Sequence, residues 1–135
     1  MPKFKRIFDF FLVLIISIPS FLSLLNNSYF SMHDDQHIAR LFLLDKGISQ
    51  GYLYPRWVDT LGFNFGYPLF NFYPPLVYYV SEIFHLIGFS FIWSIKLTFI
   101  LGFILSAYGI FLLAKKFTSK IFAYLAAVLY SYFFY

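Results

Sequence analysis

The residues with the clearest chemical potential form one short cluster, His33-Asp34-Asp35-Gln36-His37, with Arg40 three residues further on. Two adjacent carboxylates raise each other's proton affinity, or they share a cation that relieves their repulsion. The alternative is structural, because carboxylates at the start of a helix interact favourably with the helix dipole. Asp34 and Asp35 are therefore candidates for an acid–base or cation-binding site, or else they begin a helix.

The histidines of this cluster and Arg40 follow one another at spacings of four and three residues, so on a helix they form one stripe. His33 and His37 have the spacing of a helical metal pair. No third ligand is evident, which makes a zinc site at His33 the weaker alternative. His37 and Arg40 are also candidate substrate-binding residues.

A second set of candidates lies in residues 51–75, where nine aromatic residues stand among glycines, prolines and asparagines that break regular structure. Arg56 precedes Trp57, and a guanidinium near an aromatic plane suits capture of a phosphate or carboxylate. An interfacial anchor is the alternative role for Arg56. Tyr67 and Tyr73 are candidates for binding a lipid chain or sugar rings, or for packing the loop against a membrane.

The composition indicates that the elements positioning these residues belong to a membrane protein. Hydrophobic residues make up 61% of the 135-residue chain and charged residues only 12%, too few to cover a water-facing surface. The basic residues gather at the ends of apolar runs, around residues 3–6 and 115–120, which is the positive-inside pattern and argues against a nucleic-acid partner. The chain has no cysteine, so neither disulfides nor thiolate metal sites are available.

The apolar runs predict an all-α integral membrane protein. Residues 7–25 and 89–114 are each long enough to span a bilayer, and a third run starts near residue 121 and continues to Tyr135. A signal peptide is the rival interpretation of the first run. We expect the N-terminal part of a longer multi-pass protein of the cell membrane, with its N-terminus cytoplasmic and residues 26–88 outside the cytoplasm.

The long connection between the spans is predicted to carry two short helices near the membrane surface. Ser31 suits the N-cap of a helix over residues 32–46, and Gly47 suits its end. A second helix is predicted over residues 75–87, ended by Gly88.

The order of these motifs resembles a known family. A first span, Asp34-Asp35, Pro55-Arg56-Trp57 and the Gly-Tyr-Pro to Tyr-Pro-Pro stretch of residues 66–75 resemble the N-terminal region of bacterial and archaeal membrane proteins described as 6-pyruvoyl-tetrahydropterin synthase-related. That family in turn is similar to multi-spanning glycosyltransferases of the GT-C class, including the ArnT-like and RgtA-like enzymes. The resemblance covers residues 8–135.

The resemblance implies transfer of a sugar from a polyprenyl-phosphate donor, presented by the lipid bilayer, to an envelope glycan, lipid or protein. An acidic residue or pair soon after the first span acts in that class as general base or helps to hold a divalent cation such as Mg²⁺ or Mn²⁺. Here that role falls to Asp34 or Asp35, and Arg56 would contact the lipid phosphate. No pterin is expected, because a pterin synthase uses a three-histidine zinc site and only two histidines here lie near each other.

The alternative function is a non-catalytic, multi-spanning membrane protein that serves envelope assembly or the transport of lipid-linked glycans. It predicts that the aromatic loop matters while the Asp pair tolerates change to Asn.

Overall fold

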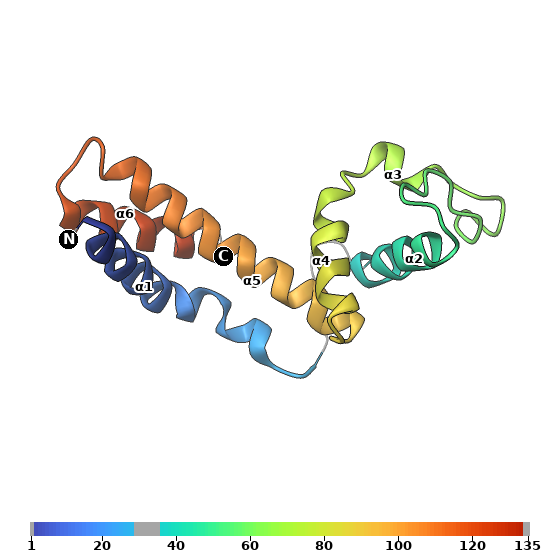
Figure 1. The fold of residues 1–135 in the computed structure, drawn as a ribbon, viewed down its shortest axis with the longest axis horizontal. Coiled ribbons are helices and arrows are strands. Elements are labelled where there is room, and N and C mark those ends of the chain that lie inside the picture. The colour runs from blue at the N-terminus through green and yellow to red at the C-terminus, as the bar shows by residue number, and fades with distance from the viewer. Residues whose placement is uncertain (1, 29–35, 134–135) are drawn as a thin grey trace. The chain divides into compact units, whose positions relative to one another are not determined.

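The computed structural model describes residues 2–28 and 36–133, and within these ranges every regular element is a helix (Figure 1). The all-α prediction is therefore confirmed for the described residues. In chain order the helices are α1 (Pro2–Phe21), the 3-10 turn η1 (Leu22–Leu25), α2 (His37–Ser49), α3 (Leu69–Phe72), α4 (Leu76–Leu86), α5 (Phe91–Ala114) and α6 (Lys120–Phe133).

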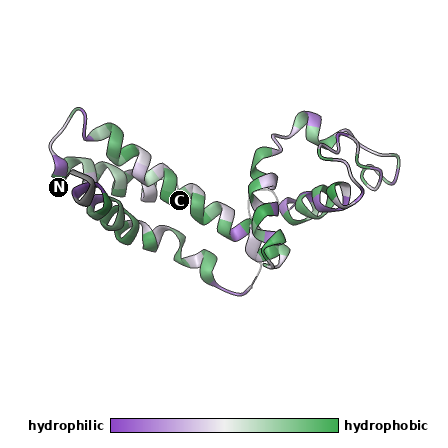
Figure 2. Ribbon diagram, in the orientation of Figure 1, coloured by the Kyte–Doolittle hydropathy of each residue, from purple (hydrophilic) through white to green (hydrophobic). Residues whose placement is uncertain are grey.

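Two helices have the length and apolar composition needed to cross a membrane, Lys5–Leu25 and Phe91–Ala114. Only 28% and 17% of their apolar windows are buried, whereas the core helix of a soluble protein is mostly enclosed. Hydrophobic residues cover most of both helices (Figure 2). These two candidate spans match the predicted runs 7–25 and 89–114 to within two residues.

The chain divides into two compact units, and the first comprises residues 1–28 and 99–135. Its core contains Ala107 of α5 together with Ala123 and Ala127 of α6, all buried against Val13 and Phe111. Small side chains let helix backbones approach closely, and this is how helices commonly associate in lipid.

A single carboxylate connects the helices of the first unit. Asp9 of α1 is 2% exposed and accepts hydrogen bonds from Lys115 Nζ at 2.8 Å and from Tyr124 Oη at 2.9 Å. Lys120 Nζ also lies 2.5 Å from Asp9 Oδ1, the same oxygen that accepts from Tyr124. The sequence pattern assigns these lysines only to the basic flank of a span, so their pairing with Asp9 is a feature that the structure adds.

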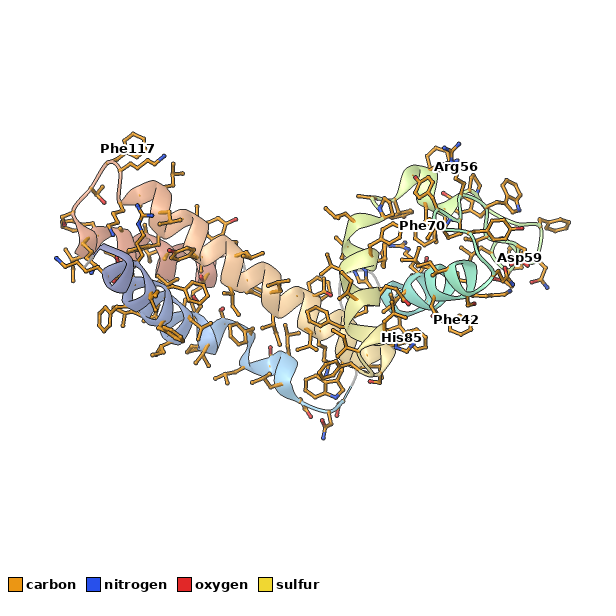
Figure 3. The ribbon with its side chains drawn as sticks, in the orientation of Figure 1. Phe42, Arg56, Asp59, Phe70, His85 and Phe117 are labelled. Atoms are coloured by element: carbon orange, nitrogen blue, oxygen red, sulfur yellow. The ribbon has the colours of Figure 1, made fainter. Side chains whose placement is uncertain are left out.

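The second unit comprises residues 29–98, in which α2 packs against α4. Leu41 and Leu44 of α2 are fully buried. Phe70 of α3, which Figure 3 labels, is also buried and meets the ring of Tyr78 edge-on, with 6.0 Å between ring centres. This small core holds the segments that carry the predicted binding residues.

The bounds of α2 differ from the predicted helix over residues 32–46. Ser31 lies outside the described residues, and the described helix begins at His37, after Gln36. At the other end, the prediction that Gly47 stops the helix is wrong. The helix runs on to Ser49, and Gly51, with a φ of 90°, follows it.

Gly47 is required for packing instead. A Cβ added at this glycine would lie 2.6 Å from Cβ of Pro55, so the absence of a side chain lets the chain return closely against α2. The second predicted stop is confirmed, because Gly88 follows α4 with a φ of 112° and its N–H donates to the carbonyl of His85 at 2.8 Å.

A closed loop of residues 58–67 lies between α2 and α3. Val58 and Tyr67 exchange two backbone hydrogen bonds, of 2.9 and 2.8 Å, and form an isolated antiparallel bridge. Positive φ is unfavourable for residues with a side chain, and closure of the loop holds several residues in that conformation. They are Gly62 (63°), Phe63 (57°), Asn64 (68°) and Gly66 (85°).

Replacing Gly66 with alanine is expected to disrupt this loop. A Cβ at Gly66 would lie 2.2 Å from Nε1 of Trp57, whereas Gly51 has a similarly positive φ but nothing within 4 Å of its added Cβ. Gly51→Ala therefore measures the backbone cost alone, about 1 kcal/mol, and Gly66→Ala should cost about 2–3 kcal/mol. Thermal unfolding checks both values, and equal losses in the two variants would contradict the clash with Trp57.

Candidate functional site

The site is centred on Arg40, which α2 holds inside the second unit with only 4% of the residue exposed. Its Nη1 donates to Tyr78 Oη at 3.2 Å and its Nη2 donates to Gln36 Oε1 at 3.3 Å. The guanidinium carbon also lies 3.8 Å from the centre of the Tyr73 ring. A guanidinium fixed in this way is oriented before any ligand arrives, which favours binding of an anion.

A pocket of about 260 Å³ opens beside this arginine. Arg40 and Gln36 form one part of its lining, Tyr67 and Tyr73 form another, and the turn at Leu61-Gly62 contributes to it from the closed loop. The structure thus brings together three residues predicted to bind substrate, Arg40, Tyr67 and Tyr73. The pocket is below the usual size of a drug-sized ligand site, and it suits a small anionic group rather than a whole lipid.

His37 shares a hydrogen-bonding partner with Arg40. Its Nδ1 lies 3.1 Å from Tyr78 Oη, the same oxygen that accepts from Arg40. Because that oxygen accepts from the guanidinium, its own proton is available to a neutral imidazole. Tyr78 is 4% exposed, and the sequence carries no motif that distinguishes it from other tyrosines in the apolar stretch.

Arg56, the other predicted phosphate contact, lines a different pocket of about 430 Å³. It is exposed, and its guanidinium carbon lies 5.5 Å from the centre of the Tyr54 ring. Lys46 and Asp59 line the same pocket and form an ion pair of 3.5 Å. Figure 3 labels Arg56 and Asp59. The two arginines, Arg40 and Arg56, therefore serve separate pockets, and only Arg40 is buried.

The predicted acidic pair, Asp34 and Asp35, and the weaker metal ligand His33 lie outside the described residues. Among residues 2–28 and 36–133, no group of three or more His, Cys, Asp or Glu side chains is placed to hold a metal ion. The prediction of a Mg²⁺ or Mn²⁺ site thus depends on residues 33–35.

Glu82 of α4 is a buried carboxyl group that belongs to none of the sequence motifs described above. It is 2% exposed, and neither of its side-chain oxygens has a hydrogen-bond partner among the described residues. Burial, followed by the charge of nearby Asp45 on α2, raises the pKa of Glu82 above its ordinary value of 4.5, while His85 opposes the shift. An acidic residue inside an apolar helix is the sequence signal that could have found it.

Glu82→Gln is expected to remove a pH dependence of stability. Because the folded-state pKa of the wild-type Glu82 carboxyl is raised, the folded unit binds more protons than the unfolded chain just above pH 4.5. The free energy of unfolding of the wild type is therefore undiminished below that pH, and it falls as pH rises through the raised pKa of Glu82. Glu82→Gln resembles the protonated form, so we expect its melting temperature at pH 8 to equal its value at low pH. Asp45→Asn should recover part of the stability that the wild type loses as pH rises. Parallel melting curves of wild type and variant against pH would contradict the assignment.

The fold and the site define an all-helical protein with two candidate membrane spans and a buried-arginine pocket in the segment between them. No protein-family model, curated protein or solved structure matches this chain. Its function is therefore inferred from the residues of the pocket and from the resemblance of its motifs.

Proposed function

We propose that this chain belongs to a membrane glycosyltransferase of the GT-C class that transfers a sugar from a polyprenyl-phosphate donor to an envelope glycan, lipid or protein. The observation that carries the proposal is the pocket beside Arg40, a buried cation in the segment that connects two candidate spans. A donor of this kind presents its phosphate just beyond the hydrocarbon, at the height where such a segment is attached to the bilayer.

The chemistry of the pocket suits a phosphate. A guanidinium binds phosphate oxygens through two parallel charge-assisted hydrogen bonds, and it is the side chain best shaped for this purpose. Gln36, Tyr67 and Tyr73 also line the pocket, and each carries a neutral hydrogen-bonding group. These groups would stabilise the negative charge that grows on the phosphate as it leaves the sugar.

The proposed transfer needs a base for the acceptor, and we assign that role to Asp34 or Asp35. The carboxylate takes the proton of the acceptor hydroxyl as that oxygen bonds to the anomeric carbon. The bond between the anomeric carbon and the phosphate oxygen breaks, and the lipid phosphate keeps the electron pair. A divalent cation held by the same carboxylates, which are suitable ligands for Mg²⁺ or Mn²⁺, would supply further positive charge to the phosphate.

The alternative, a non-catalytic protein of envelope assembly or lipid-linked glycan transport, would use the same phosphate pocket. It has no need of a general base, so it differs from the transferase in its response to loss of the Asp pair.

The test uses the full-length gene in its host. The gene is deleted and restored as wild type, Asp34→Asn or Asp35→Asn, and lipid-linked and surface glycans are profiled by mass spectrometry. Loss of one sugar in the deletion strain and in either Asn variant, at unchanged protein level, is the expected result. Complete restoration by both variants would overturn the transferase and favour assembly or transport.

A further inference from the structure

Two phenylalanines at the tip of the closed loop are almost fully exposed, Phe63 at 97% and Phe65 at 87%. Burying apolar surface is favourable in proportion to its area, and aromatic rings are among the largest apolar groups, so leaving two of them in water forgoes a large stabilisation. Trp57 beside the loop is also 61% exposed. An exposed apolar group of this size marks an interaction surface.

The backbone of the loop is built to present these rings. Phe63 and its neighbour Asn64 have φ values of 57° and 68°, which residues other than glycine rarely adopt. The two hydrogen bonds between Val58 and Tyr67 close the loop, and a third runs from Gly66 N–H to the Leu61 carbonyl at 3.0 Å. The rings are therefore held outward by a closed, locally unfavourable backbone.

The chemistry of the surroundings favours lipid as the partner. No charged side chain occurs from Thr60 to Ser81, so the tip carries no charge that would have to be desolvated in an apolar phase. Tyrosine and tryptophan flank it, and these residues favour the interface between membrane and water. Residues 26–90 connect two candidate spans, Lys5–Leu25 and Phe91–Ala114. The loop is therefore tethered at both ends to segments that would lie in a bilayer.

We propose that the loop of residues 58–67 inserts Phe63 and Phe65 into the bilayer at the boundary between headgroups and acyl chains. Interfacial elements of this kind insert about 5–10 Å. Leu61, Gly62 and Tyr67 of the same loop also line the Arg40 pocket, so insertion of the tip places that pocket at headgroup level. The inference does not depend on sugar transfer.

The test exploits the absence of cysteine, which lets a single thiol carry an environment-sensitive NBD label. The label is attached to Phe65→Cys, which lies outside the positive-φ residues of the loop, in the full chain reconstituted into liposomes of phosphatidylcholine and phosphatidylglycerol. Ser49→Cys, at an exposed position at the end of α2, is the matched control. We expect the tip label to emit further to the blue and to be quenched by nitroxide-bearing lipids at least about two-fold more than the control.

The pattern of quenching distinguishes a tip inserted in lipid from one that is exposed to water or covered by protein. Protection of the tip label from iodide together with quenching by lipid nitroxides supports insertion, and adding Phe63→Ser should reduce both effects. Quenching by iodide but not by lipid would show a water-exposed tip, and protection from both quenchers would show that protein covers it; either result overturns the inference. Circular dichroism checks that the labelled chains remain helical, and the glycan profile is read independently of these results.

Discussion

Replacing Arg40 with glutamine is expected to weaken the binding of polyprenyl phosphate to the purified full-length protein by at least about ten-fold. A charge-assisted hydrogen bond contributes about 1.5–3 kcal/mol, and 1.4 kcal/mol corresponds to a factor of ten in affinity. Arg40→Lys retains the charge but loses the planar fork and its stacking on Tyr73, so it should restore binding only in part. Binding is measured by fluorescence titration or calorimetry in detergent.

Arg56→Gln is the matched control, because it removes the same chemical group from an exposed position in the other pocket. We expect it to change affinity by less than about three-fold, as exposed charges contribute little. Melting temperatures of both variants separate lost binding from lost folding, since Arg40 also donates to Tyr78 at 3.2 Å within the core. A larger effect of Arg56→Gln than of Arg40→Gln would move the phosphate to the second pocket.

Asp9→Asn is expected to destabilise the first unit by about 2 kcal/mol. Asp9 is 2% exposed, so the variant leaves Lys115 facing a buried amide that cannot neutralise it. This loss of stability is smaller than the loss expected when a fully buried ion pair is broken, because the Lys115 side chain is 40% exposed and partly solvated. Thermal unfolding in detergent, followed by circular dichroism, measures the loss.

Tyr124→Phe provides the control for this cluster. It removes one hydrogen bond of 2.9 Å to Asp9 while keeping the charges of Asp9, Lys115 and Lys120, so a smaller loss of about 1 kcal/mol is expected. A melting temperature of Asp9→Asn equal to that of the wild type would show that the cluster only neutralises charge and contributes nothing to the packing of α1 against α6.

The candidate spans and the helical class could be read from the sequence because they depend on local properties. An apolar run of sufficient length predicts a spanning helix wherever it occurs, and α5 begins within two residues of the predicted position. Gly88 ended its helix as predicted, because a positive φ is a demand of the local backbone. Arg40, Tyr67 and Tyr73 are candidates because of their residue types, which the sequence shows without a fold.

Only the tertiary structure decided which of these residues act together. Asp9 pairs with Lys115, 106 residues away, and Arg40 meets Tyr78, 38 residues away; periodicity within one helix carries no information on such pairs. Glycine is a common residue at the end of a helix, but Gly47 lies inside α2. It is needed there because Pro55 packs directly against it. The assignment of Arg40 and Arg56 to separate pockets likewise depends on how α2, the closed loop and α4 pack, because burial and orientation arise from contacts between distant segments and not from residue type.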